Sequence, residues 1–304
     1  MKVIFCLVGP TATGKSDLAL RLAEFFPIEV ISMDSAMVYR GMDIGTAKPS
    51  LSERQKVMHH LIDILSPNES FSAGDFFKGV SDLADKVLSR GKLPLIVGGS
   101  LMYFNVIKNG MASLPKRDEQ FRLFFQERKN YVGLSNLYFE LQSIDQVYSS
   151  KISINDEKRI ERGLEIYYLT GKKPSEMLEK RNFLPFKLIN FYLSDCIDNL
   201  RLRIKDRLRR MLQRGLVAEV DDLIKNGTSP NSVAMQNIGY KQVILYLKGE
   251  ITLEEMEQQI FYATSRLAKH QITWLKKWLN EEVQLRVGDR NLFNIISNRI
   301  ELML

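Results

Sequence analysis

The sequence has few features that would place it outside a reducing, aqueous compartment. Its two cysteines, Cys6 and Cys196, stand far apart and lack metal-site spacing, so we expect neither a disulfide nor a zinc site. The longest uncharged apolar run covers residues 3–8, far short of the roughly 20 residues that cross a bilayer. It ends at Gly9-Pro10 without a small-residue cleavage site. We therefore expect a buried strand rather than a signal peptide or membrane segment, and a cytoplasmic protein.

Repeats and low-complexity stretches are absent as well. Apolar residues make up 45% and charged residues 26% of the 304 residues, which excludes a disordered tail protein. The net charge of +7 is modest and suggests a phosphate-rich partner where basic residues cluster. One cluster covers residues 201–214, with seven basic residues and one acid. It predicts a contact with phosphate or RNA rather than only a solvated helix face.

The first hundred residues alternate between buried strands and amphipathic helices. Continuous apolar runs predict strands at 2–8, 29–33 and 93–97, and helical spacing of apolar residues predicts helices at 16–26 and 73–88. Short apolar strands separated by helices are typical of a parallel sheet with helices on both sides. This part of the chain is therefore predicted to be an α/β core.

The pattern changes after Asn109-Gly110. We expect an all-helical insertion over 113–185, after which a strand at 186–193 rejoins the sheet, so that 1–112 and 186–304 form the core. Further helices are predicted at 198–214, 219–225, 240–247 and 253–278, whereas the last 25 or so residues are weakly patterned. Seven aromatic residues have the spacing of core packing in the insertion: Phe121, Phe124, Phe125, Tyr138, Phe139, Tyr167 and Tyr168.

A phosphate-binding loop follows the first strand. Its residues match G-x-x-x-x-G-K-[ST], between a buried strand and a helix: Gly9, Pro10, Thr11, Ala12, Thr13, Gly14, Lys15 and Ser16. Glycines let the backbone wrap around phosphate oxygens, so that several N–H groups and the helix N-terminus face the anion. Lys15 adds a positive charge, and the Ser16 hydroxyl can hold Mg²⁺. The sequence therefore predicts a phosphate-binding loop, which alone would suggest a kinase or NTPase.

Asp34 is the only acid at the end of a predicted strand. Kinases and NTPases usually carry an acid that organises Mg²⁺ at a neighbouring strand end, but the strand at 93–97 runs into Gly98-Gly99-Ser100. The carboxyl ends of parallel strands face the ligand crevice, so Asp34 is expected beside the phosphate loop as a base or metal ligand. The alternative is a turn or helix-capping Asp.

Seven motifs in order resemble those of the bacterial tRNA dimethylallyltransferases, also called tRNA isopentenyltransferases. The resemblance spans about residues 3–278, and the run at 42–49 is highly specific to that family. The motifs are Gly9–Ser16, Asp34–Pro49, His59–Asp63, Gly98–Tyr103, Asn155–Arg162, Ile238–Lys241 and Ala268–Trp274.

The resemblance implies transfer of a dimethylallyl group from dimethylallyl diphosphate to the exocyclic amine of the adenosine just 3′ of the anticodon. The phosphate loop would then hold a diphosphate leaving group with Mg²⁺, which neutralises charge as the allylic C–O bond breaks. By the same resemblance, Asp34 is the general base, Arg207 lies near the diphosphate and Arg203 is its less certain partner.

The resemblance also implies base flipping and a set of tRNA contacts, with the basic insertion gripping the anticodon stem-loop of a tRNA bound by a monomer. The matching positions are Asp34, Ser35, Ala36, Met37, Ser100, Arg122, Lys158, Arg159, Ile160, Glu161 and Arg162. Weaker candidates lie at 269–276 and at Gln236, Asn237, Ile238, Gly239, Tyr240 and Lys241.

Four residues depart from the family pattern, and two other functions stay open. Met37 replaces a common Gln, Ser100 a common Thr, Gly163 an expected Ala, and His270 an expected Arg. A kinase for a small metabolite and a non-catalytic RNA-binding protein are the alternatives, and some members of the wider group prenylate free adenine nucleotides. His59 and His60 are expected in a structural turn.

Overall fold

The chain divides into two compact units. The computed structural model describes residues 2–278 and 283–303. Unit 1 comprises Met1–Lys108 and Pro185–Leu304, and unit 2 comprises Asn109–Leu184, so unit 2 begins at 109 rather than at the expected 113. The difference arises at β5 (Met111–Ala112), which pairs antiparallel with β6 (Arg181–Asn182) inside unit 2. The insertion is therefore not entirely helical.

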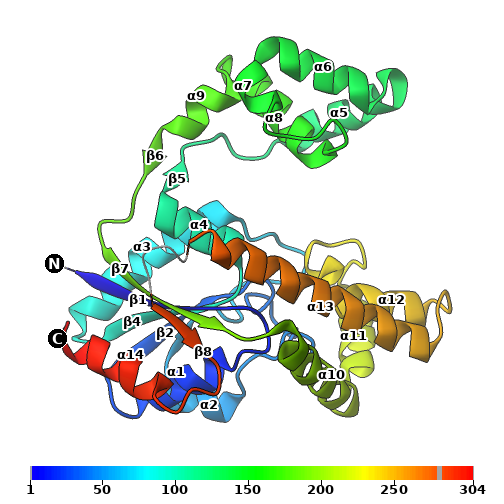
Figure 1. Ribbon diagram of the computed structural model, residues 1–304. Helices are drawn as coiled ribbons and strands as arrows, with labels where there is room; N and C mark the ends of the chain where they lie inside the picture. Colours follow the sequence, from blue (N-terminus) through cyan, green and yellow to red (C-terminus); the bar gives the residue numbers. More distant parts are fainter. Residues whose placement is uncertain (1, 279–282, 304) are drawn as a thin grey trace. The chain divides into compact units, whose positions relative to one another are not determined.

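A parallel six-stranded sheet forms the centre of unit 1 (Figure 1). Its spatial order is β3-β2-β4-β1-β7-β8, and each pair of neighbours is parallel. The predicted α/β fold with a parallel sheet is confirmed. The strands are β1 (Val3–Val8), β2 (Ile28–Met33), β3 (His59–His60), β4 (Leu93–Gly98), β7 (Lys187–Ser194) and β8 (Val283–Arg286).

Helices cover both faces of this sheet because alternate strand residues point to opposite sides. On one face, Phe5, Val97 and Phe191 pack in a core cluster with α1 (Lys15–Ala23) and α14 (Leu292–Glu301). The opposite face is covered by α3 (Ala73–Ser89) and α4 (Leu101–Asn109).

Four further helices of unit 1 form a second layer with its own core. Val38, Tyr39 and Met42, from the segment after β2, are buried in this cluster together with residues of the four helices. The segment after β2, residues 34–49, is called the Met42 segment below. It is thus packed against the helical layer. The helices are α10 (Ile197–Gln213), α11 (Leu216–Lys225), α12 (Tyr240–Leu247) and α13 (Leu253–Lys276), with a short 3₁₀ helix at Ala234–Gln236 before α12 and α2 (Leu51–Lys56) after the Met42 segment.

Unit 2 buries a small core between three of its helices. Phe121, Phe125, Leu137 and Leu164 belong to a cluster of buried apolar side chains. Its helices are α5 (Glu119–Val132), α6 (Leu134–Ile144), α7 (Gln146–Ser149), α8 (Glu157–Thr170) and α9 (Pro174–Glu179).

The prediction that seven aromatic residues form this core holds for Phe121, Phe125 and Tyr138, whereas the half-buried Tyr167 and three exposed residues lie outside the cluster. Phe124, Phe139 and Tyr168 are 45%, 54% and 51% exposed. Phe121 and Phe125 are one turn apart and fill the inward face of α5, which leaves Phe124 at its edge under the Arg128 guanidinium. Tyr168 instead donates a hydrogen bond to Glu140.

Two elements at the C-terminal end escaped prediction. β8 adds a strand beside β7, and α14 packs its buried Ile296 and Ile300 against the sheet. His59 and His60 form a short strand rather than a turn, because β3 pairs with β2 and His60 bonds to the Glu29 carboxylate at 2.7 Å. Among the described residues, none of the helices combines the length and apolarity needed to span a bilayer.

Candidate active site

The phosphate loop joins β1 to α1 in a tight turn. Ala12 and Gly14 adopt positive φ angles of 64° and 77°, and the Thr13 hydroxyl donates to the Pro10 carbonyl at 2.8 Å. A Cβ atom on Gly9 would lie 2.8 Å from the Leu193 carbonyl oxygen, so this first position requires glycine. The loop leads directly into the N-terminus of α1, whose free N–H groups suit an anion.

Lys15 is a half-buried basic residue that the loop keeps in place. Its Nζ donates to the Pro10 carbonyl at 2.7 Å and to Thr13 Oγ1 at 3.3 Å. Burial, followed by repulsion from Arg207, lowers the pKa of Lys15 to about 7, although Asp34 partly offsets this. An anionic ligand beside Lys15 would supply negative charge that stabilises its protonated form.

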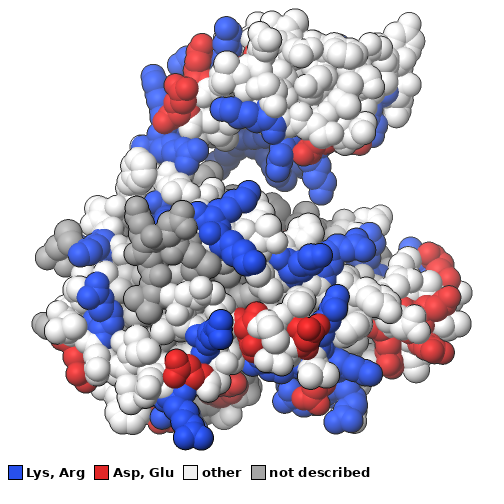
Figure 2. Space-filling view, in the orientation of Figure 1, with Lys and Arg blue, Asp and Glu red and all other residues white. Residues whose placement is uncertain are grey.

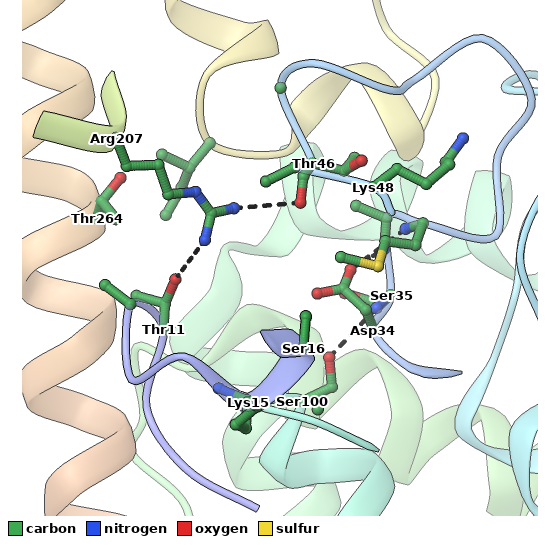
Figure 3. Close-up of a pocket in the computed structure, with 18 of the residues that line it drawn as sticks. Thr11, Lys15, Ser16, Asp34, Ser35, Thr46, Lys48, Ser100, Arg207 and Thr264 are labelled. Carbon is green, nitrogen blue, oxygen red and sulfur yellow. Dashed lines mark hydrogen bonds between the residues drawn. The ribbon is translucent and has the colours of Figure 1, made fainter. Parts of the chain in front are cut away.

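Arg207 reaches the same place from α10. Its guanidinium donates to Thr11 Oγ1 at 3.4 Å and to the Thr46 carbonyl at 3.1 Å, as Figure 3 shows. Burial lowers the pKa of Arg207, but the guanidinium is so strongly basic that it remains a cation. Arg207 therefore joins the phosphate loop to the segment around Thr46.

Asp34 lies where β2 ends and faces the cavity that Lys15 and Arg207 line (Figure 3). One carboxylate oxygen, Oδ1, accepts hydrogen bonds from the backbone N–H groups of Ala36 at 2.8 Å and Met37 at 3.2 Å. Asp34 thus has the turn role that was the alternative to a site role. Its second oxygen accepts no hydrogen bond from a described residue, so the turn role leaves it available to a ligand.

The ends of β2 and β4 meet at this point. The Ser35 N–H donates to Ser100 Oγ at 3.2 Å, and a Cβ atom on Gly98 would lie 2.1 Å from the Met33 carbonyl oxygen. The glycine lets the two strand ends approach closely, which brings Ser100 beside Ser35.

The segment after β2 is anchored by a carboxylate that sequence reasoning missed. Glu219, on α11, accepts hydrogen bonds from the backbone N–H groups of Asp43, Ile44 and Gly45 at 3.0, 2.6 and 3.1 Å. The Tyr240 hydroxyl donates to the same carboxylate at 2.6 Å. Nothing in the sequence pairs Glu219 with a segment 174 residues earlier.

An ion-pair network around the buried Lys48 holds the other end of that segment. Lys48 Nζ contacts Asp43 at 2.6 Å and Asp63 at 2.5 Å, and it donates to the Tyr39 carbonyl at 2.8 Å. Arg54 also pairs with Asp63, at 2.6 Å. With all three of its protons donated, Lys48 acts on the shape of the segment and not as a free cation.

These parts enclose one large cavity in unit 1, of about 1000 Å³. The cavity brings together predicted residues from five of the seven motifs, and its wall contains Gln271, which lies in the weaker candidate range 269–276. Predicted residues that line it are Thr11, Ala12, Gly14, Lys15, Ser16, Asp34, Ser35, Ala36, Met37, Ser100, Arg203, Arg207, Gln236, Asn237, Ile238, Gly239, Tyr240, His270 and Trp274.

Two of the side chains predicted to bind tRNA are completely buried. Tyr240 and Ile160 each have 0% exposure, because Tyr240 packs against the Met42 segment and Ile160 lies in the core of unit 2. Lys241 is exposed beside Tyr240. At these segments, exposed neighbours such as Lys241 are therefore the residues that a large ligand can contact.

The other predicted cations of unit 2 differ in exposure and in their ion pairs. Lys158 and Arg159 are exposed at the start of α8, where Arg159 pairs with Asp156 at 3.3 Å. Arg122 pairs with Glu119 and Glu161, and Arg162 pairs with the buried Glu165. Figure 2 shows basic side chains along one edge of unit 2 and over the region of α10 in unit 1.

Comparison with known proteins identifies the family. A sequence model described as IPP transferase matches residues 37–278. The chain belongs to the IPP transferase family. It is 44% identical over 281 residues to a tRNA dimethylallyltransferase of Neisseria meningitidis serogroup C (strain 053442), a match that covers 90% of this chain and 89% of the relative. It is 43% identical over 280 residues to a protein of the same name from Legionella pneumophila (strain Corby), covering 91% and 90%.

Solved structures show the same relationship. The full-length tRNA isopentenylpyrophosphate transferase of Bacillus halodurans is 34% identical with a TM-score of 0.71, and the match covers 99% of this chain and 96% of the other. A eukaryotic dimethylallyltransferase acting on tRNA is 27% identical with a TM-score of 0.83, covering 99% and 78%. The family expected from the seven motifs is confirmed, as is the expectation of a prenyl-transferring enzyme.

Proposed function

We propose that the chain transfers a dimethylallyl group from dimethylallyl diphosphate to the N6 amine of the adenosine 3′-adjacent to the anticodon of tRNA. The observation that carries the proposal is that Lys15 of the phosphate loop shares one cavity with the available oxygen of Asp34. Membership in the IPP transferase family, and relatives named for acting on tRNA, support the choice of substrates.

The diphosphate end of the donor binds at the loop. The backbone from Gly9 to Ser16 and the N-terminus of α1 offer N–H donors, while Lys15 and Arg207 add positive charge at the same place. These groups bind the departing diphosphate more tightly as negative charge builds on it, which lowers the barrier to C–O cleavage.

The residues at the loop also fit Mg²⁺. The Ser16 hydroxyl lies exposed in the first turn of α1 and makes no hydrogen bond with a described residue. Mg²⁺ binds oxygen ligands and commonly takes one or two from the protein and others from substrate phosphates. Bound through Ser16, the ion would supply charge neutralisation at the diphosphate.

Asp34 acts on the acceptor. The allylic carbon loses its bond to the diphosphate oxygen and gains one to N6, while the diphosphate leaves with the bonding electron pair. N6 then carries a surplus proton, which the free oxygen of Asp34 accepts. The backbone N–H groups of Ala36 and Met37 hold the other oxygen and so fix the direction of the carboxylate.

The acceptor base must leave its stack to reach this cavity, as in other enzymes that modify a base. Ser35, Ala36, Met37 and Ser100 line the cavity where a flipped adenine would lie. Exposed Lys158 and Arg159 of unit 2 suit the phosphates of an anticodon stem-loop. A tRNA substrate accords with a cytoplasmic monomer.

A transfer assay tests the proposed substrates. Purified protein, Mg²⁺ and radiolabelled dimethylallyl diphosphate are offered either an anticodon stem-loop or free AMP and ATP. We expect label on the stem-loop alone. Label on the free nucleotides alone would contradict the tRNA assignment, and label on none of them would redirect attention to a kinase with ATP as the phosphoryl donor.

A further inference from the structure

A glutamine on α13 is bonded to the phosphate loop. Gln271 is 7% exposed; its Oε1 accepts a hydrogen bond from the Thr11 N–H at 2.9 Å, and its Nε2 donates to the Gly99 carbonyl at 2.7 Å. The carboxamide thus links the loop after β1 to the turn after β4, two segments that lie far apart in the sequence.

The junction leaves no room beyond the carboxamide. A Cβ atom on Gly99 would lie 2.8 Å from Gln271 Nε2 and 3.0 Å from the Gly9 carbonyl oxygen. Gly9 itself packs against Leu193 of β7. Because the backbone segments approach this closely, the Gln271 side chain fixes the spacing between them.

Thr11 is held from two sides. Gln271 accepts its N–H, and Arg207 donates to its hydroxyl at 3.4 Å. Loss of the carboxamide would leave the Thr11 N–H and the Gly99 carbonyl without these partners, and an unpaired buried polar group costs about 1–3 kcal/mol. The loop would relax toward another conformation that satisfies the Thr11 N–H.

We propose that Gln271 is a positioning residue that holds the phosphate loop in its diphosphate-binding shape. Gln271 lies on α13 between His270 and Trp274, which also line the cavity, so this helix would contribute to donor binding. This inference rests on the proposed function, because it takes a diphosphate as the ligand of the loop.

Gln271→Met keeps the volume of the side chain and removes both hydrogen bonds. We expect it to weaken the binding of inorganic diphosphate with Mg²⁺ to the full chain about tenfold, measured by calorimetry, and to raise the KM for dimethylallyl diphosphate more than it lowers kcat. Affinity for an anticodon stem-loop should stay within about twofold of wild type. The exposed Gln259 of the same helix gives the matched control, Gln259→Met, which should bind diphosphate like the wild type.

A second variant and a second measurement separate the two hydrogen bonds of Gln271. Gln271→Glu still accepts from the Thr11 N–H but cannot donate to Gly99, and its charge repels the ligand, so it should bind diphosphate more weakly than Gln271→Met. In the ligand-free protein, hydrogen exchange at the Thr11 amide should be slow in the wild type and in Gln271→Glu, and fast in Gln271→Met.

Two results would overturn the inference. One is a folded Gln271→Met that binds diphosphate within about twofold of wild type, and the other is a loss confined to stem-loop binding. Failure of the proposed function has a different signature. In that case the wild type would bind diphosphate and Gln271→Met would bind it more weakly, but neither protein would transfer label to RNA. This result would support the positioning role of Gln271 and contradict tRNA prenylation.

Discussion

At the scale of residues, the site depends on side chains whose charge is set by their surroundings. Asp34 divides its two oxygens between a backbone turn and the cavity, and the half-buried Lys15 donates to two oxygens of the loop beside a second cation, Arg207. Each side chain is therefore fixed by hydrogen bonds to the protein and keeps one group for a substrate. For Asp34 this group is the second carboxylate oxygen, and for Lys15 it is the ammonium charge.

Asp34→Asn separates these two contributions. The amide oxygen of the substituted side chain still accepts from the backbone, so the fold and RNA affinity should be kept, while turnover falls by at least about a hundredfold because the base is gone. Single-turnover transfer rates and stem-loop binding measure the two effects. The exposed Asp82 of α3 provides the control, Asp82→Asn, and equal turnover in both variants would refute a base role.

Lys15 predicts proton uptake on ligand binding. Its pKa of about 7 in the free protein means that much of it is neutral at pH 8.5, and a bound diphosphate raises that pKa by stabilising the charged form. Affinity for diphosphate should therefore fall as pH rises from 7 to about 9. Calorimetry at pH 8.5 in two buffers of different ionisation enthalpy should show proton uptake with the wild type and none with Lys15→Met. Equal binding heats of the wild type in both buffers would contradict proton uptake by Lys15.

At the scale of elements, the phosphate loop and six elements of the sheet and its flanking helices could be predicted because each carries a local pattern. These elements are β1, β2, β4, β7, α1 and α3. Residues 3–8 form a continuous apolar run, and the loop follows at a fixed spacing. β8 and α14 lack so clear a pattern, and β8 is a short strand whose place depends on pairing with β7.

The polar anchors of the site are the other part that the sequence does not reveal. Glu219 and Gln271 lie on helices and bond to segments more than 170 residues away, so no local pattern reveals these contacts, although Gln271 falls within the motif at 268–274. Gln271 does leave one trace: it falls in the buried stripe of α13 with Ala268 and Leu275, where an apolar residue would be expected.

Glu219→Gln tests the anchor of the Met42 segment. The amide nitrogen of the new side chain would face backbone N–H groups that now bond to a carboxylate. We expect a loss of about 1–3 kcal/mol in the free energy of unfolding and weaker diphosphate binding, because Thr46 then holds Arg207 less firmly. Denaturant unfolding and calorimetry measure these effects. Glu257→Gln, at an exposed position of α13, should change neither quantity, and a stable Glu219→Gln would disprove the anchor.

Gly163→Ala tests why unit 2 departs from the family pattern at α8. A Cβ atom there would lie 2.7 Å from a ring carbon of Tyr148 and 2.9 Å from Leu141. We expect a loss of about 1–3 kcal/mol in stability from overpacking, despite the better helix propensity of alanine. Gly79→Ala on α3 is the control, since its nearest contact is an ordinary 3.4 Å and thermal unfolding should not move downward.

At the scale of the whole molecule, the proposed function assigns different roles to the two units. Unit 1 contains the phosphate loop, Asp34 and the cavity, and unit 2 presents exposed cations at the start of α8. Donor binding should therefore depend on unit 1 alone, whereas RNA affinity should depend on both.

A double substitution in unit 2 tests this division. Lys158→Gln with Arg159→Gln should weaken stem-loop binding and reduce the slope of log affinity against log salt by about 2, because two phosphate contacts are lost. Diphosphate affinity should not change. Lys78→Gln, exposed on α3, serves as the control, and an unaltered salt slope in the double variant would contradict the role of α8.

The most direct test of the central claim is the mass spectrum of nucleosides from tRNA treated with the protein, dimethylallyl diphosphate and Mg²⁺. The account predicts that the adenosine 3′-adjacent to the anticodon gains the mass of one isopentenyl unit with wild-type protein and stays unmodified with Asp34→Asn. The account would be contradicted if this adenosine stayed unmodified with the wild-type protein, or if it gained the same mass with Asp34→Asn.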